Sequence, residues 1–240
     1  GTPKEISSEP INSVLKSRIS IPIKNLRLSN DLTYQRFSKG QQFEYISADQ
    51  INKVNLNTDL SLEIFKHQLW LSHQYFNQED EGATRLQSGT ILFRNTTSID
   101  RGQLTLNHFW QIKGKTSIRQ TLRKAGYKRS YKVKNPSEVL ERDDITTENN
   151  TEYELLFKHD RGNIKVNGGF ELSNPRYKSD RIAGGRQKKD VIGVFNQVAL
   201  KLFDAVDLVA GLRLDKYGDT TVVSPRLALS YKPNETWTLR

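Results

Sequence analysis

The feature that most constrains this chain is a two-residue alternation of apolar and polar side chains that recurs along its length. Residues 54–64 alternate Val, Leu, Thr, Leu, Leu and Ile with Asn, Asn, Asp, Ser and Glu. Segments 103–113, 152–158, 164–172 and 206–215 show the same pattern. An amphipathic helix would instead bring apolar residues back after three and four positions. The alternation therefore predicts an all-β chain whose strands carry one apolar face. Weaker alternation occurs at 19–24, 31–37, 69–76, 88–96, 193–203 and 223–232.

The connections between these segments alternate between short and long. Four short ones suit tight hairpins; they are 65–68, 100–102, 160–163 and 204–205. The last three contain Gly, Asn or Asp, which tolerate positive φ. The long polar ones are 38–52, 77–87, 114–150 and 173–191. Bacterial membrane barrels have short periplasmic turns and long external loops. The order predicts an antiparallel transmembrane β-barrel, partial, with about twelve strands. Residues 113–150 are expected to form a long external loop or a protruding hairpin.

Composition excludes several classes of function. The chain has no cysteine, so disulfides, thiolate nucleophiles, zinc ribbons and iron–sulfur sites are ruled out. No catalytic signature such as G-x-S-x-G or H-E-x-x-H occurs, and we predict neither an enzyme nor a metal site nor a cofactor. No apolar run approaches the roughly 18 residues of a helical membrane span. The chain has no methionine and no visible signal peptide, which suggests a mature or excised piece.

The most specific motifs lie in the last fifty residues. The chain reads Leu-Val-Ala-Gly-Leu-Arg-Leu-Asp-Lys-Tyr at 208–217, Ser-Pro-Arg-Leu-Ala-Leu-Ser-Tyr-Lys-Pro at 224–233 and Thr-Leu-Arg at 238–240. Phe-Asn-Gln at 195–197 and Leu-Phe-Asp at 202–204 precede them. This succession resembles mid-barrel strands of TonB-dependent outer-membrane receptors, where a GLR-D-Y strand precedes an SPRL-L-Y-P strand and a TLR strand start. The close resemblance covers 190–240, and the earlier part matches in strand rhythm.

The resemblance implies a barrel of about 22 strands filled by an N-terminal plug. Such receptors import iron–siderophore, heme or cobalamin-type ligands with energy from an inner-membrane complex. We find no plug domain and no TonB-box-like segment in 1–240, which is expected to be a partial β-barrel domain. The predicted function is part of an active transporter of the bacterial outer membrane that takes up a siderophore-like iron chelate. Its implied partners are outer-membrane lipid, lipopolysaccharide, an anionic ferric chelate and, through a plug, the TonB complex.

Two other classes of function remain open. One is a barrel without active transport, either a passive porin or a structural or adhesive outer-membrane protein. The other is a soluble, basic β-sheet binding module whose apolar faces form a sandwich core. An upstream plug would favour the transporter, whereas solubility without detergent would favour the binding module.

The net charge of +10 is concentrated in residues 113–135, which contain nine Lys and Arg and no acidic residue. In an external loop this cluster would attract an anionic ferric chelate; alternatively it neutralises lipopolysaccharide phosphates or is simply solvated. Acidic residues return at 138–148, and no nucleic-acid-binding motif is present, so no nucleic acid partner is predicted. A second basic stretch lies at 176–189. The candidate ligand-binding residues are Lys115, Arg119, Arg123, Lys124, Tyr127, Lys128, Arg129, Tyr131, Arg181 and Arg186.

Histidines and aromatic residues complete the set of candidates. His67 and His159 fall near predicted turns, and His73 and His108 fall on the apolar side of strands. None lies in a predicted external loop, so heme ligation is not expected. An aromatic girdle at strand ends, or ordinary cross-strand packing, is predicted for Trp70, Trp110, Trp237, Tyr75 and Tyr231. Pro225 cannot donate to a ladder and is expected at a strand start or a bulge.

Overall fold

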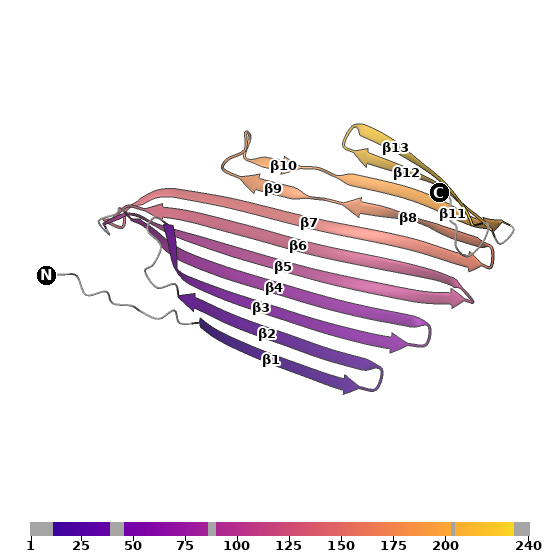
Figure 1. Cartoon of the computed structure of the whole chain (residues 1–240), viewed down its shortest axis with the longest axis horizontal. Helices are drawn as coiled ribbons and strands as arrows, with labels where there is room; N and C mark the ends of the chain where they lie inside the picture. The colour runs from indigo at the N-terminus through magenta and orange to yellow at the C-terminus, as the bar shows by residue number, and fades with distance from the viewer. Residues whose placement is uncertain (1–11, 39–45, 86–89, 203–204, 233–240) are drawn as a thin grey trace.

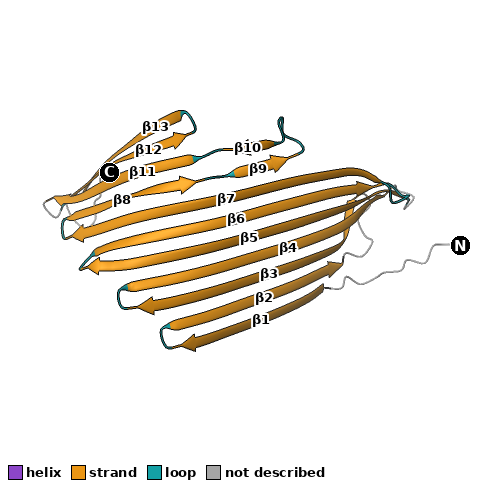
Figure 2. Cartoon of the chain, turned by 180° about the vertical axis from the view of Figure 1, so that it is seen from behind, coloured by secondary structure: helices purple, strands orange, loops and turns teal. Residues whose placement is uncertain are grey.

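The computed structural model describes residues 12–38, 46–85, 90–202 and 205–232, which form one antiparallel sheet of thirteen strands (Figures 1 and 2). The strands are β1 Asn12–Ile23, β2 Leu26–Ser38, β3 Ile46–Ile64, β4 His67–Arg85, β5 Ile91–Lys113, β6 Thr116–Lys134, β7 Leu140–Arg161, β8 Ile164–Ser173, β9 Arg176–Ser179, β10 Arg186–Lys188, β11 Val191–Leu202, β12 Val206–Tyr217 and β13 Thr220–Tyr231. The prediction of an all-β antiparallel fold is confirmed.

The sheet is a meander in which most strands pair with their neighbours in sequence. The order runs from β1 to β8 and continues through β11, β12 and β13. The short strand β9 pairs with β7 beyond the end of β8, and β10 pairs with β9. Figure 1 shows the long strands side by side, with the β9–β10 hairpin beyond the end of β8. Across the described ranges, no helix is long and apolar enough to cross a membrane.

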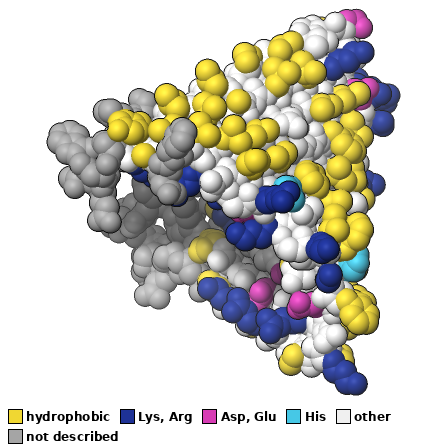
Figure 3. Space-filling view, turned by 90° about the vertical axis from the view of Figure 1, so that its right-hand side faces the viewer, with side chains coloured by type: hydrophobic (Ala, Val, Ile, Leu, Met, Phe, Trp, Pro, Cys, Tyr) yellow, Lys and Arg dark blue, Asp and Glu magenta, His cyan; other side chains and the backbone are white. Residues whose placement is uncertain are grey.

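The register of the strands gathers the apolar residues on one side of the sheet, which we call the apolar face. Leu28 lies opposite Leu60, Leu60 opposite Leu71, Leu71 opposite Leu106, and Leu106 opposite Leu122. Most of these side chains are exposed, and no second layer covers them within the described part of the chain. Figure 3 shows such hydrophobic side chains gathered in bands on the surface. A soluble sandwich would need a second sheet here, which the described residues do not provide.

Two-residue turns connect β1–β2, β3–β4, β5–β6 and β7–β8, and all lie at the same end of the sheet (Figure 1). We call this the turn end and the opposite one the distal end. Each of these turns begins with a residue of positive φ, as tight hairpins require; these residues are Lys24, Phe65, Gly114 and Gly162. The predicted short turns at 65–68 and 160–163 are confirmed at this end, whereas residue 204 of the predicted turn at 204–205 lies outside the described residues. At the distal end, β12 and β13 are also joined by only two residues, 218–219.

The predicted turn at 100–102 is wrong, because β5 runs through it without interruption from Ile91 to Lys113. Asp100 and Gly102 occupy successive positions on the apolar face, opposite Asn77 and Tyr75. Gly102 does not have positive φ. The Asp-Arg-Gly sequence is compatible with a turn, but pairing to β4 and β6 on both sides keeps the segment extended.

The predicted long loops are also mostly strand. Strands β3 and β4 pair along most of 46–85, and β6 pairs with β7 in a hairpin whose connection is only residues 135–139. Strands β3 to β7 contain 19 to 23 residues, whereas a tilted membrane strand needs about 9–11. Each therefore extends well past the apolar section as a sheet that is polar on both faces. The apolar alternation therefore ends before the strands do, and the predicted loops begin where only the alternation ends.

Pro225 lies inside β13 opposite Leu212, so its prediction at a strand start or bulge is wrong. Among the described strands, β13 is the last in the sheet and pairs with β12 alone. Proline has no N–H group, so it is tolerated at a position where the backbone nitrogen need not donate a hydrogen bond to a neighbouring strand.

Gly169 in β8 should be intolerant of any side chain. A Cβ at this position would overlap the backbone oxygen of Leu155 and lie 3.0 Å from the Phe195 ring. We expect Gly169→Ala to destabilise the barrel by about 1–3 kcal/mol through overpacking. Gly102→Ala is the control, since nothing lies within 4 Å of its added Cβ. Samples of each variant are heated to increasing temperatures before gel electrophoresis, and the temperature at which the folded band disappears measures the stability of each. Equal loss in the two variants would contradict the proposed cause.

Candidate functional site

The side of the sheet opposite the apolar face, called the polar face, carries the candidate site. Strand β6 shows the division most clearly. Arg123, Tyr127 and Arg129 have odd numbers and lie on the polar face, whereas Lys124 and Lys128 lie on the face that contains Leu122. The pleat of a strand separates neighbouring residues in this way. The candidates on β6 therefore form two groups, arginine with tyrosine on one face and lysine on the other.

Nearest the turn end, the arginines of the polar face are paired with glutamates of β7. Arg119 lies 3.5 Å from Glu154, and Arg123 lies 2.9 Å from Glu152. A hollow of about 270 Å³ beside them is lined on three strands by Thr121, Arg123, Glu152, Tyr153, Glu154, Glu171, Leu172 and Ser173. Because carboxylates compensate both guanidinium groups, this part of the face offers little net attraction to an anion.

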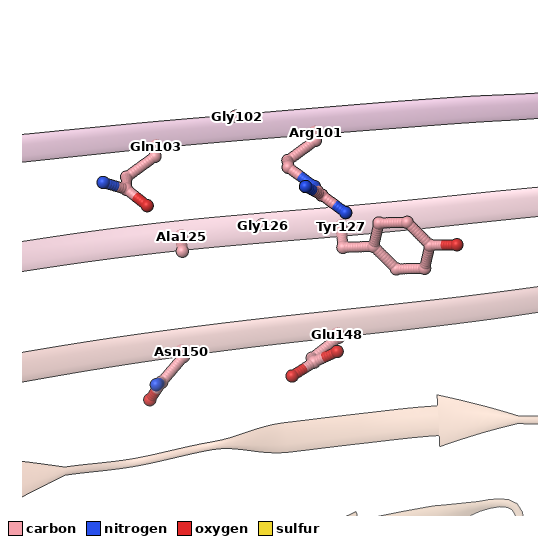
Figure 4. A pocket seen from close by; sticks show the side chains of 8 residues that line it. All are labelled: Arg101, Gly102, Gln103, Ala125, Gly126, Tyr127, Glu148 and Asn150. Carbon is pink, nitrogen blue, oxygen red and sulfur yellow. The ribbon is translucent and has the colours of Figure 1, made fainter. Parts of the chain in front are cut away.

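A second hollow of about 380 Å³ lies further along the polar face, over β5, β6 and β7 (Figure 4). Ala125, with only a methyl group, leaves open space between the longer side chains around it. Figure 4 shows Arg101 from β5 reaching toward Tyr127 on β6, and the guanidinium lies 5.7 Å from the ring centre. The residues that line this second hollow are Arg101, Gly102, Gln103, Ala125, Gly126, Tyr127, Glu148 and Asn150.

A third hollow, the distal hollow, has a volume of about 270 Å³ and lies nearest the distal end. It shares Tyr127 with the second hollow, so the two adjoin. Arg129 contributes a guanidinium that forms no ion pair among the described residues. Tyrosine rings and arginines are suited to holding an anionic aromatic ligand. The lining residues are Tyr127, Arg129, Tyr131, Asp144, Thr146, Tyr177, Ser179, Arg181 and Ile182.

The far wall of the distal hollow is fixed by Asp144. Its carboxylate pairs with Arg181 and, at 2.6 Å, with Arg142. The hydrogen bond from Arg181, with the charge of both arginines, holds the pKa of Asp144 below its ordinary value. Beside it, the buried Ser179 hydroxyl lies 3.2 Å from that of Thr146. These contacts attach the β9–β10 segment to β7.

The structure brings together only some of the candidate residues. Tyr127, Arg129, Tyr131 and Arg181 line one hollow. Lys115 lies in the two-residue turn at the opposite end, 4.0 Å from Asp160, so its placement in a long external loop is wrong. Arg119 and Arg123 lie among glutamates, and Arg186 lies in β10. Lys124 and Lys128 are on the other side of the sheet.

Sequence reasoning missed Arg101 and Tyr177 as lining residues. Arg101 was assigned to a turn and Tyr177 to a loop, and both lie on strands. The two-residue alternation along β5 could have placed Arg101. It has an odd number, as do the polar residues Gln103, Thr105 and Asn107 further along the strand, so it lies on the same face.

All four histidines lie on the apolar face, as their alternation predicted for His73 and His108. The Nδ1 atom of His67 lies 3.0 Å from the Nε2 atom of His108, and the His67 ring also stacks on Trp110. Within the described ranges, no group of three or more His, Asp or Glu side chains is placed to hold a metal ion. Trp70 lies on the polar face, so the girdle prediction is wrong for this residue; Trp237 lies outside the described residues.

An ion cluster joins three strands in the region of the most specific sequence motif. Arg213 on β12 lies 2.6 Å from Glu171 on β8 and 2.8 Å from Asp215. It reaches across β11 at Gly193, where a Cβ would lie only 2.7 Å from the Asp215 carboxylate. The guanidinium also lies 5.8 Å from the centre of the Phe195 ring. The Gly-Leu-Arg-Leu-Asp sequence thus places Arg213 and Asp215 on the polar face and the alternating Leu212 and Leu214 on the apolar face.

A meander of long antiparallel strands, apolar on one face and polar on the other, with tight turns at one end, is the wall of a transmembrane β-barrel. The sequence model of the TonB dependent receptor-like β-barrel family matches residues 20–240, and the chain belongs to this family of the bacterial outer membrane. Its members are receptors and transporters rather than enzymes.

Solved structures support the same fold. The FrpB iron transporter of Neisseria meningitidis matches with a TM-score of 0.69 and 11% identity, over 95% of this chain and 44% of that one. The siderophore receptor PiuA of Acinetobacter baumannii matches with a TM-score of 0.63 and 13% identity, over 93% and 46%. A mutant of the ferric enterobactin receptor PfeA of Pseudomonas aeruginosa gives 0.65 and 12%, over 95% and 40%. The chain thus spans less than half the length of these structures. No curated protein sequence matches it.

Removing the Arg213 side chain should lower the free energy of unfolding more than removing that of an exposed arginine. Its loss leaves the Asp215 carboxylate, only 8% exposed, without a partner. Because Arg213 is itself 39% exposed, we expect Arg213→Leu to destabilise the barrel by about 1–3 kcal/mol, less than a fully buried pair would lose. Arg18→Leu removes a pair whose arginine is 79% exposed and should cost about 0.5 kcal/mol or less. Urea unfolding of both variants tests the ranking, and equal losses would contradict it.

The β9–β10 segment should detach from β7 only in strong acid. The pKa of Asp144 is lowered in the folded chain, so its ion pairs are fully formed above the ordinary carboxyl pKa. They are lost as the pH falls through the lowered value. A spin label at Ala183→Cys, in a chain without other cysteines, should stay immobile near neutral pH and become mobile only at a pH below the ordinary aspartate pKa of about 3.9. With Asp144→Asn the label should be mobile throughout. A transition near neutral pH in the parent would refute this assignment.

Proposed function

We propose that this chain forms part of an outer-membrane receptor that takes up an anionic iron chelate of the siderophore type with TonB-derived energy. The observation that carries the proposal is the distal hollow, where Arg129, Tyr127, Tyr131 and Tyr177 face the same space. An iron chelate of this kind is a compact anion, with which guanidinium groups form charge-assisted pairs and to which tyrosine hydroxyls can donate hydrogen bonds.

The position of the hollows supports an inward path. The three hollows follow one another along β6 and β7 on the polar face, from the distal hollow through the second hollow to the hollow nearest the turn end, which contains Arg123. Arg129 in the distal hollow and Arg101 in the second hollow form no ion pair among the described residues, but the Glu148 carboxylate also lines the second hollow. Nearer the turn end, Arg119 and Arg123 are compensated by glutamates. Attraction is thus strongest at the distal end and weaker toward the turn end. A ligand captured at the distal end would meet surfaces that bind it less tightly further in.

The similar structures supply the iron chemistry of the proposal. They include an iron transporter, siderophore receptors and a ferric enterobactin receptor crystallised with enterobactin. Energy coupling in this family passes through a plug and the inner-membrane TonB complex, and we propose the same route for the full-length protein. The apolar face then contacts outer-membrane lipid. A passive porin with the same wall would pass small sugars into liposomes without energy, which distinguishes that alternative.

Arg129→Gln should weaken the binding of an anionic chelate and leave a neutral one unaffected. Loss of one charge-assisted contact predicts about tenfold lower affinity for a ferric tris-catecholate. A neutral ferric tris-hydroxamate should change less than about twofold. Arg27→Gln is the matched control, because Arg27 is an exposed arginine of the polar face at the turn end.

Binding is measured by tryptophan fluorescence on the full-length receptor in detergent. Equal weakening by Arg27→Gln and Arg129→Gln would show only a general charge effect and remove the distal hollow from the proposal. Uptake that persists in cells without TonB would contradict the energy-coupling part, whatever the binding result.

A further inference from the structure

One carboxylate on the polar face is left without a partner where the second hollow adjoins the distal hollow. Glu148 is exposed and lines the second hollow, and its carboxylate forms no hydrogen bond or ion pair within the part of the chain that the structure describes. Glu152 and Glu154, on the same strand nearer the turn end, are paired with arginines. An unpaired carboxylate attracts a cation, and the binding of an anion does not use it.

Strand pairing places Glu148 in a straight row of side chains across four strands. Arg101 on β5 lies opposite Tyr127 on β6, which in turn lies opposite Glu148 on β7. On its other side Glu148 lies opposite Tyr177 on β9. Directly paired residues share a face of the sheet, and Figure 4 shows Tyr127 on the strand between Arg101 and Glu148. The carboxylate therefore has a tyrosine on each side.

A carboxylate between two tyrosines has the chemistry of an ammonium site. An ammonium group donates hydrogen bonds to a carboxylate and is attracted to the face of an aromatic ring within about 6 Å. One of the two rings already attracts a cation, since the Arg101 guanidinium lies 5.7 Å from the centre of the Tyr127 ring. Tyr177 is 37% exposed, and no Lys or Arg of the described ranges lies over its ring.

The positive groups of the two hollows are held away from Glu148. Arg101 is two strands distant, a separation of about 10 Å between the backbones. Arg129 lies two residues further along β6 and is not paired with Glu148. Asn150, the next polar-face residue on β7, donates its amide hydrogen to Glu152 at 2.7 Å instead. The hollows therefore carry separated charges, positive over β5 and β6 and negative over β7.

We propose that Glu148, Tyr127 and Tyr177 form a subsite for an ammonium group, so that the chelate taken up is a zwitterion. Its anionic part lies over Arg129 and Arg101, and its amine lies over β7. The subsite rests on the proposed function, because it belongs to the same two hollows. The spacing calls for an amine on a short arm, about 5–10 Å from the anionic groups of the chelate. A chelate without the amine would meet an uncompensated carboxylate.

The test compares two ligands on the full-length receptor in detergent: a ferric tris-catecholate that carries one primary ammonium group, and the same chelate with that amine acetylated. The parent should bind the ammonium form about fivefold more tightly at low salt, through an ion pair and a cation–π contact. The net charge of +10 favours the more negative acetylated form, so a general charge effect has the opposite sign. Equal affinities, or tighter binding of the acetylated form, would overturn the proposal.

Glu148→Gln should remove this preference without weakening the binding of the anion. We expect affinities for the two forms within about twofold of each other. The acetylated form should bind at least as tightly as it binds the parent, because a nearby negative charge is gone. A preference that survives in Glu148→Gln would reject the subsite.

The matched control is Glu63→Gln, since Glu63 is an exposed glutamate of the polar face at the turn end. This variant should keep the fivefold preference of the parent. Equal loss in Glu63→Gln and Glu148→Gln would reduce the effect to net charge and overturn the proposal.

The aromatic part of the subsite is tested at Tyr177. Tyr177→Phe keeps the ring and should keep the preference, whereas Tyr177→Leu should reduce it to about twofold. A full preference in the leucine variant would exclude this ring from the subsite, and an equal loss in the two variants would contradict the cation–π contact.

Arg129→Gln separates the ammonium subsite from the proposed function. It should weaken the binding of both ligand forms alike and leave their ratio unchanged. If it does so while the parent shows no preference for the ammonium form, only the subsite is rejected. If Arg129→Gln changes the affinity for neither form, the anion site of the proposed function is rejected, even where Glu148 still governs the preference.

Discussion

The whole structure depends on backbone pairing between antiparallel neighbours, which extends over strands of up to 23 residues with register shifts only near their ends. Each ladder satisfies the amide and carbonyl groups of its strands, which a membrane interior cannot do. The same pairing fixes the pleat, so every second side chain must lie on the same face. Separation of the apolar face from the polar face follows from this constraint together with the sequence alternation. No packed core is required, and Ala83 and Leu156 are the buried apolar side chains among the described residues.

Pairing also explains why the sheet continues beyond its apolar section. Strands β6 and β7 are joined at the distal end by residues 135–139, and each residue pair along their ladder adds backbone hydrogen bonds whatever its side chains. Side chains in the distal half are then free to be polar on both faces. This is where the distal hollow and the exposed Lys124 and Lys128 are found. The wall near the turn end carries the apolar face, and its distal continuation carries the hollows of the polar face.

The sequence was sufficient to predict the fold class, the apolar face and the tight turns within 65–68 and 160–163, which the structure places at 65–66 and 162–163. It could not predict the length of the strands, because residues such as 77–85 are held by ladder pairing that leaves no apolar pattern. Asp100-Arg101-Gly102 illustrates the same limit: its local preference for a turn is overridden by neighbours on both sides. For the site, composition located the basic cluster, but only the register could show which of its members share a face.

That distinction changes the meaning of the basic cluster. Counted as a whole, residues 113–135 form a single block of positive charge, for which an anionic ligand and lipopolysaccharide are competing explanations. On a strand they cease to compete, because Arg129 and Lys128 are adjacent in sequence and point to opposite sides of the sheet. The choice of side chain agrees with this division. The planar guanidinium suits a discrete, oriented anion, whereas the flexible ammonium suits phosphates at a mobile headgroup layer. One strand therefore presents arginine and tyrosine on one face and lysine on the other, and a change on one face need not disturb the other.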